Sequence, residues 1–183
     1  LFKRSFDCPV YGTRFQNESP IMAEEFDYSI SIGQLPYFFR RTGNFPGDAY
    51  LKTDDERRLQ WRALFDTFSG RKIGVAWNGG LKSTGSARRS LTLADFEPLL
   101  NDTDTFISLD YKEGSDRLKC YPEVLKGRDI DDMAPLIAEL DLIISCTTTV
   151  VHLAGALGVP CYTLVPYNPP WVFCNEGDYE WSD

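Results

Sequence analysis

The stretch DLIISCTTTVVHLAGALGVPCYTLVP, residues 141–166, decides the fold. It begins with a short continuous apolar run, and its middle places Val150, Leu153, Ala154 and Leu157 at helical spacing. A second apolar run follows Gly158 and Pro160. These patterns predict a buried strand over 142–145, a helix over 148–158 and a second strand over 161–166. Continuous apolar strands that alternate with helices are typical of a parallel sheet.

The same alternation extends toward the start of the chain. Further strands are predicted at 72–77 and 105–110, and further helices at 54–68, 93–101 and 131–140. Thr92 is the expected cap of the second of these helices, and Pro135 is expected in the first turn of the third. The segment 116–125 is ambiguous. The sequence therefore predicts an α/β fold, a Rossmann-like three-layer α/β/α arrangement around a mainly parallel sheet.

Residues 1–50 differ from the remainder. They are rich in aromatic residues, Gly and Pro, and only Tyr28–Ile32 alternates as a strand would. We expect an irregular arm over 1–50, followed by the Rossmann-like domain over 51–183.

Composition narrows the classes of function. The 183-residue chain carries a net charge of -8 and has a pI of about 4.7, which disfavours nonspecific binding to nucleic acid. No apolar run reaches the roughly 20 residues of a membrane helix. The five cysteines, an odd number without a CxxC pair, predict reduced thiols and a cytoplasmic location. With one histidine in the chain, a His/Cys metal site is not expected.

Two polar segments follow predicted strands, where open α/β sheets bind ligands. In the first, Asn78, Gly79 and Gly80 permit a close backbone approach, and Lys82, Arg88 and Arg89 supply positive charge. This combination suits a diphosphate, although a solvated surface loop is the alternative. Asp110, Tyr111 and Lys112 follow the next strand and give a weaker signal.

The second segment is Thr147, Thr148 and Thr149, at the start of the helix that contains His152. A helix N-terminus offers unpaired N–H groups and a partial positive charge to an anion. One threonine is needed as a cap, which leaves two for a ligand. His152 lies off the apolar stripe of its helix, beside Thr148 and Thr149, so we expect it to contact the ligand.

The chain resembles the C-terminal donor-binding domain of GT-B-fold glycosyltransferases. The segments that carry this resemblance are, in order along the chain, KIGVAWNGG, ARRSLTLADFEPLL, TFISLD, DIDDMAPLIAELDLIIS, TTTVVHLAGALGVPCYTLVPY and PPW. The similarity is to the heptosyltransferases and to the related domain attached to tetratricopeptide repeats in bacterial glycosyltransferases. It covers residues 26 to about 173, and its most specific part ends in HLAGALGVP.

The resemblance implies one half of a GT-B fold, which binds a nucleotide sugar without metal or another cofactor. It implies that the loop from Trp77 to Gly80, with Lys82 and Arg89, faces the donor phosphates or sugar. It places Asp132 and Met133 near the nucleoside, and it assigns the diphosphate to Thr147, Thr148, Thr149 and His152.

The sequence departs from the pattern of this family at Thr147, where the family has Asp, and at Thr149, where it has a small residue. The N-terminal domain of such enzymes, which binds the acceptor and supplies the general base, is expected to be missing apart from its tail. The chain is thus expected to be a fragment, and its catalytic residues stay unassigned.

Two other functions are open. One is a noncatalytic binding module that docks through its arm, favoured by Thr147 and by aromatic residues such as Tyr37, Phe38, Phe39, Trp171 and Phe173. The other is an epimerase of nucleotide sugars, which is disfavoured because the chain has a single histidine.

Overall fold

The computed structural model describes residues 1–11, 26–39, 47–80, 85–110, 115–126, 129–169 and 173. In this part of the chain four strands form one sheet in the order β2-β1-β3-β4. The strands are β1 (Lys72–Ala76), β2 (Thr105–Ser108), β3 (Leu142–Cys146) and β4 (Cys161–Leu164), and all neighbouring pairs are parallel. The predicted α/β fold with a parallel sheet is confirmed.

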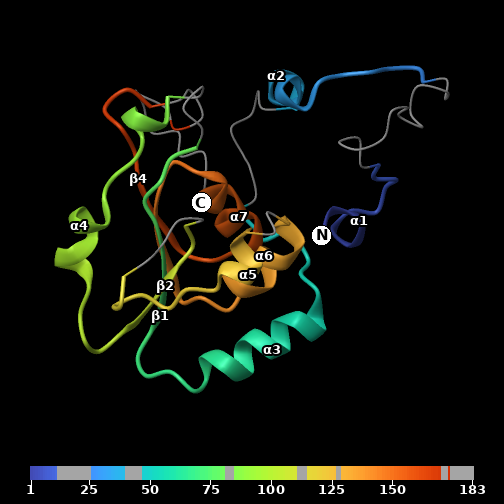
Figure 1. The fold of residues 1–183 in the computed structure, drawn as a ribbon. Coiled ribbons are helices and arrows are strands. Elements are labelled where there is room, and N and C mark those ends of the chain that lie inside the picture. Colours follow the sequence, from blue (N-terminus) through green and yellow to red (C-terminus); the bar gives the residue numbers. More distant parts are fainter. Residues whose placement is uncertain are drawn as a thin grey trace.

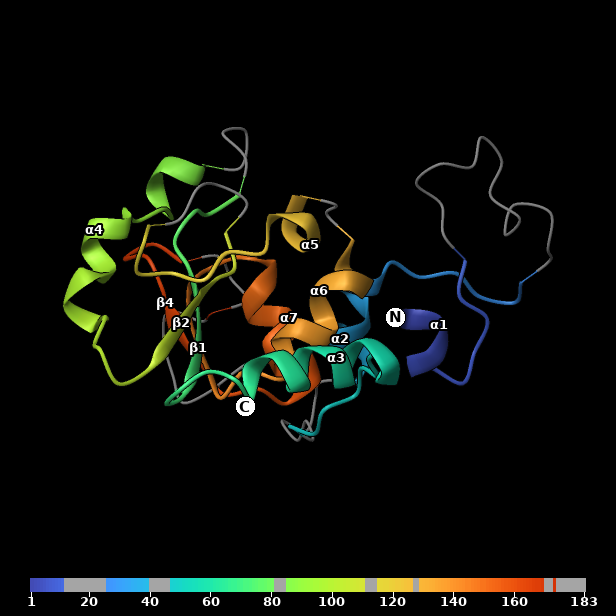
Figure 2. The same cartoon turned by 60° about the horizontal axis from the view of Figure 1, so that its bottom comes forward.

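Helices cover both faces of the sheet (Figures 1 and 2). One face packs against α3 (Asp55–Phe65), α5 (Pro122–Lys126), α6 (Ile130–Ile137) and α7 (Thr149–Leu157). The opposite face packs against α4 (Leu93–Phe96) and the following 3-10 turn η5 (Glu97–Leu99). Each face therefore has its own apolar core, one around Ile107, Leu136 and Ile143 and the other around Val75 and Phe96.

Helix α7 forms where the sequence predicts it. Thr148 is its N-cap, and Gly158 ends it with a φ of 74°, a left-handed conformation that glycine adopts without steric cost. Val150, Leu153 and Ala154 are buried, as the apolar stripe requires, whereas His152 is exposed. Burying each large aliphatic side chain contributes about 1.5–3 kcal/mol, so the stripe fixes α7 against the sheet.

Two local predictions are wrong. Asp129 caps α6, which begins at Ile130, so Pro135 lies in the second turn and not the first. The helix expected over 93–101 divides into α4 and η5, since Pro98 has no N–H to continue the α-helical pattern. In the arm, the strand-like alternation of Tyr28–Ile32 has no partner strand among the described residues. It leads instead into η2 (Ile32–Gln34) and α2 (Leu35–Phe39).

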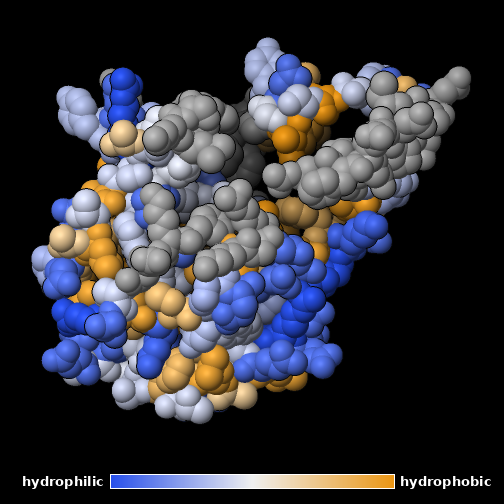
Figure 3. All heavy atoms as spheres, in the orientation of Figure 1, coloured by the Kyte–Doolittle hydropathy of each residue, from blue (hydrophilic) through white to orange (hydrophobic). Residues whose placement is uncertain are grey.

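The described part of the arm is short of regular structure. Its first residues form α1 (Phe2–Ser5), and α2 carries exposed apolar side chains that are visible in Figure 3. None of the helices in the described ranges combines the length and the apolar character that a membrane crossing requires.

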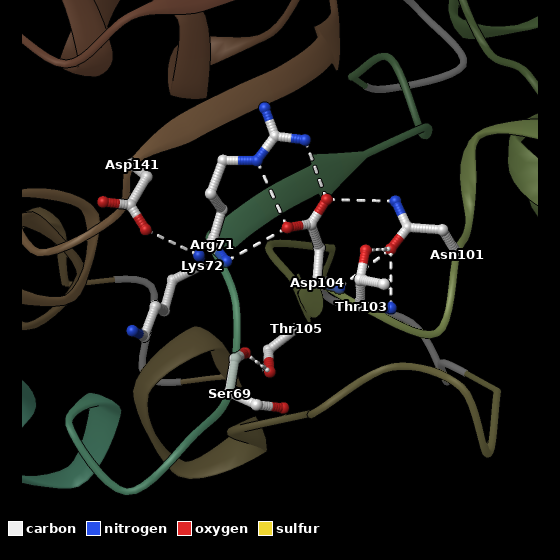
Figure 4. A network of polar contacts seen from close by, with 8 residues as sticks. All are labelled: Ser69, Arg71, Lys72, Asn101, Thr103, Asp104, Thr105 and Asp141. Atoms are coloured by element: carbon white, nitrogen blue, oxygen red, sulfur yellow. Dashed lines mark hydrogen bonds and ion pairs between the residues drawn. The ribbon is translucent and has the colours of Figure 1, made fainter.

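A polar network closes the amino edge of the sheet, where the strands begin (Figure 4). Arg71 donates to both carboxylate oxygens of Asp104, from Nε at 3.2 Å and from Nη2 at 2.8 Å. Asn101 donates to the same carboxylate from Nδ2 at 3.0 Å. Lys72 N donates to Asp141 at 2.7 Å, and Thr105 Oγ1 donates to the Ser69 carbonyl at 2.9 Å. Hydrogen bonds and an ion pair thus join the residues at the starts of β1, β2 and β3.

Candidate functional site

The candidate site lies at the carboxyl edge of the sheet, where β1, β2 and β3 end. Because the strands are parallel, the residues that follow them reach the same edge. These residues are Asn78, Gly79 and Gly80 after β1, Asp110 after β2, and Thr147, Thr148 and Thr149 after β3. Two polar segments that are distant in the sequence therefore meet here, as the sequence predicted.

Asp110 anchors the segment after β1. Its Oδ2 accepts hydrogen bonds from Asn78 N at 2.9 Å and from Asn78 Nδ2 at 2.8 Å. The Asp110 side chain is buried, and a buried carboxylate is stabilised when such donors surround it. The Asp110–Asn78 pair therefore fixes the direction in which the chain leaves β1 toward Gly79 and Gly80.

Gly79 is required by the packing of its own loop. A Cβ at this position would lie 2.8 Å from Arg89 Cβ and 2.9 Å from the Arg89 carbonyl oxygen. Gly79 N donates to Ser90 Oγ at 2.9 Å, and Leu91 N donates to the Trp77 carbonyl at 2.9 Å. The loop thus returns to the end of β1 and brings Arg89 beside Gly79. Gly80 adopts a φ of 75°, which also favours glycine.

Arg89 links the ends of β1 and β3. Its Nη1 lies 3.5 Å from the Thr147 carbonyl oxygen, a long hydrogen bond between half-buried groups. The guanidinium is therefore held next to the threonine segment at the start of α7. It brings a positive charge to the end of the helix that already carries a partial positive charge, an arrangement that favours an anion.

The three threonines have different environments. Thr148 is the N-cap, since its Oγ1 accepts from Val150 N at 3.2 Å and lies 3.2 Å from Ser145 Oγ. Thr149 is exposed in the first turn. Thr147 is 3% exposed, and its hydroxyl has no hydrogen-bond partner among the described residues. One threonine caps the helix, as the sequence predicted, and the contact of the other two with a ligand stays a prediction.

The unsatisfied hydroxyl of Thr147 is energetically unusual. Leaving a buried polar group without a partner costs about 1–3 kcal/mol, so such groups are rare in folded proteins. This hydroxyl lies beside Arg89 and the N-terminus of α7, where positive charge favours an anion.

Cys146, directly before this threonine, has no role as a nucleophile. Burial and the nearby charge of Asp110 raise the pKa of its thiol to about 11. At neutral pH the thiol is protonated and inert. Cys8, Cys120, Cys146 and Cys161 are free thiols, and Cys174 lies outside the described residues.

The remaining predicted site residues are less closely tied to this edge. His152 is exposed on α7, off the buried stripe as expected, and its ring centroid lies 5.9 Å from that of Phe173. Its contact with a ligand stays a prediction. Lys82 lies outside the described residues.

Asp132 and Met133 have structural contacts. Asp132 forms an ion pair with Arg57 of α3, and Met133 is 3% exposed within the core. The Met133 side chain is thus occupied by packing, and the proximity of either residue to a nucleoside stays a prediction.

Two contributors escaped the sequence reasoning. Ser90 binds Gly79 N, and Ser145 supports the cap through Thr148. Serines in loops and at strand ends are too common to single out, so no pattern in the sequence signals either of them. In the described ranges, no group of three or more His, Cys, Asp and Glu side chains is arranged to hold a metal ion.

Comparison with known proteins adds one relative. The chain is 28% identical over 173 residues to Protein FlbA of Caulobacter vibrioides, in an alignment that covers 86% of this chain and 29% of FlbA. The chain thus matches less than a third of the length of that relative. No family model matches the chain. No solved structure matches it significantly.

Proposed function

We propose that the carboxyl edge binds the diphosphate of a nucleotide sugar, and that the domain is the donor half of a metal-independent glycosyltransferase. The observation that carries this proposal is the buried hydroxyl of Thr147, which has no hydrogen-bond partner within the described ranges and lies beside Arg89 at the N-terminus of α7. A hydroxyl, a guanidinium and a helix N-terminus all favour the same ligand chemistry, an anion with several oxygen acceptors.

In this proposal the site acts on the leaving group. The acceptor oxygen attacks the anomeric carbon with inversion, the bond from that carbon to the diphosphate oxygen breaks, and the electron pair leaves with the nucleoside diphosphate. Arg89, the Thr147 hydroxyl and the first turn of α7 stabilise this negative charge, which is electrostatic preorganisation without a metal. The general base that takes the acceptor proton is expected in another domain.

The test is equilibrium binding of UDP, GDP and ADP to the 183-residue chain in EDTA, by isothermal titration calorimetry. We expect one of the three to bind, and we expect Arg89→Gln to weaken that binding about 10- to 100-fold, as removal of a charge-assisted hydrogen bond does. Lys119→Gln is the control, because Lys119 is an exposed cation that lies over the Phe68 ring and is not part of the candidate site. The proposal is contradicted if the wild-type chain binds none of the three nucleotides. It is also contradicted if the Arg89→Gln variant and the control variant bind the nucleotide with the same affinity.

A noncatalytic module is the second candidate. It is favoured by the exposed aromatic side chains of Tyr37, Phe38 and Phe39, which the domain does not use for its own core. Both candidates bind the nucleotide. Sugar release or transfer from a radiolabelled nucleotide sugar by the full-length gene product separates them, since a noncatalytic module leaves the label on the donor.

A further inference from the structure

Two segments that are far apart in the sequence meet near the C-terminal end of α7, the end opposite to the candidate site. Lys52 N donates to Ser5 Oγ at 2.9 Å, and the rings of Phe6 and Tyr50 lie 6.1 Å apart. We call residues 1–6 and 47–53 the clasp. The clasp thus joins Ser5 and Lys52, which are 47 residues apart in the sequence.

The clasp caps the far end of α7. Tyr50 N and Leu51 N both donate to the Ala156 carbonyl, at 3.0 and 2.9 Å. Ala49 lies against Gly158, close enough that a Cβ on this glycine would be 3.0 Å from Ala49 Cβ. Since the last carbonyls of a helix have no acceptor role within the helix, these outside donors stabilise its last turn.

The clasp also contacts α6. Arg4 forms an ion pair with Asp131 in the first turn of α6, and Leu51 packs against the core beneath α6 and α7. Because α6 and α7 pack against each other, the clasp is connected to α7 both directly and through its neighbour.

We propose that the clasp is a conformational switch that acts on the anion site through α7. The C-terminal turn of α7 is held by the clasp, and its N-terminus carries Thr147, Thr148 and Thr149. An open clasp loosens the helix and lowers affinity for the anion. By linkage, an anion bound at the N-terminus favours the closed clasp. The part of this proposal that concerns the anion rests on the function proposed above.

The first test uses amide hydrogen exchange and needs no ligand. Phe6→Ala removes the ring contact with Tyr50, and Ser5→Ala removes the acceptor for Lys52 N. We expect exchange in α7 to accelerate about 5- to 10-fold in either variant, the effect of one lost hydrogen bond or a similar contact. Amides of β1 and β2 should keep their wild-type rates.

The control variant is Tyr28→Ala, which removes an aromatic ring that is 93% exposed and outside the clasp. It should leave α7 unchanged. Unaltered exchange of α7 in both clasp variants overturns the proposal. So does equal acceleration of α7, β1 and β2, because that result indicates general destabilisation.

The second test adds the nucleotides. If the wild-type chain binds UDP, GDP or ADP, Phe6→Ala should bind that nucleotide several-fold more weakly, and Tyr28→Ala should bind it as the wild type does. Equal affinity despite faster exchange in α7 refutes the coupling to the site. A wild-type chain that binds none of them refutes the proposed function, while the exchange data still decide whether the clasp holds α7.

Discussion

The two edges of the sheet differ in how their polar groups are satisfied. At the amino edge, the Asp104 carboxylate accepts from Arg71 and Asn101 at both oxygens, and the network extends to β1, β2 and the start of β3 (Figure 4). At the carboxyl edge, Arg89 reaches a carbonyl at 3.5 Å, and the buried Thr147 hydroxyl has no partner among the described residues. The first edge is thus closed by paired groups that stabilise the fold, whereas the second contains the polar groups to which we assign the proposed ligand.

Glycines at the two edges show the same difference. Gly70 has a φ of 65°, and a Cβ there would lie 1.8 Å from the Thr103 carbonyl oxygen. Gly79 is instead close to Arg89, a residue of the candidate site. Close packing around Gly70 thus holds the main chain at the amino edge of the sheet, whereas close packing around Gly79 positions the charged side chain of Arg89.

The largest effect is expected at the amino edge. Gly70→Ala combines a left-handed backbone with a clash against main chain, so we expect it to lower the free energy of unfolding by about 3 kcal/mol or more. Urea denaturation measures this loss. Gly155→Ala is the control, since a Cβ at this helical position meets nothing within 4 Å, and it should stabilise the chain by up to about 1 kcal/mol. Equal stability of the two variants would show that the amino edge is not tightly packed.

Acid should weaken the amino edge specifically. Hydrogen bonds from Arg71 and Asn101 hold the pKa of Asp104 well below its usual range. A carboxylate with a lowered pKa in the folded state contributes stability that is complete above its unfolded pKa of about 3.9 and is lost as pH falls toward its folded pKa. We therefore expect Asp104→Asn to reduce the dependence of unfolding free energy on pH below about 4.

Urea unfolding at pH 2.5, 4 and 7 tests this expectation. Asp102→Asn is a suitable control, because Asp102 is fully exposed and has only a distant ion pair with Arg117 at 3.7 Å. If the slope of the Asp104→Asn variant equals that of the wild type, the network does not act as described.

Neighbouring threonines separate stability from binding at the carboxyl edge. Thr148→Val removes the N-cap and should cost about 1 kcal/mol of unfolding free energy. Thr147→Val removes a hydroxyl that has no partner in the described part of the chain, so the unfolding free energy should stay within about 0.5 kcal/mol of wild type or rise. Thermal and urea unfolding of both variants check the difference. A larger loss for Thr147→Val would mean that its hydroxyl serves the fold.

The smallest effect is expected at His152. Its side chain is exposed and contacts the ring of Phe173. His152→Ala should therefore change the unfolding free energy by less than about 0.5 kcal/mol. Combined with a weaker binding of nucleotide, this result would assign the imidazole to the site, whereas a marked loss of stability would assign it to the fold.

The sequence predicts those features that depend on local pattern. The continuous apolar run of β3 and the stripe of α7, ended by Gly158, are strong signals, and both elements form as expected. The hydrophobic pattern does not predict the exact bounds of a helix where a single proline or capping residue sets them. Pro98 divides one predicted helix, and the Asp129 cap starts α6 early enough to place Pro135 in its second turn.

The sequence predicts which two segments form the candidate site, but it does not predict the contacts that hold their side chains in place. Strand ends identify the loop after β1 and the threonines, because a parallel sheet brings them together. The contacts that place Arg89 come from Gly79 and Ser90, through a loop closure that has no periodicity to reveal it. Met133 shows the opposite case, since with Leu136 and Ile137 it follows the spacing of a buried helical stripe, and its place in the core agrees with that local pattern.

The central claim is that an anion binds between Arg89 and the N-terminus of α7. The most direct measurement is a titration of the isotopically labelled chain with UDP, GDP and ADP, followed by amide chemical shifts. We predict that the nucleotide that binds shifts the amides of Thr147, Thr148, Thr149 and Arg89 most strongly, while those of Arg71 and Asp104 at the opposite edge stay in place. Absence of shifts with all three nucleotides, or shifts that leave these four residues unaffected, would contradict the account.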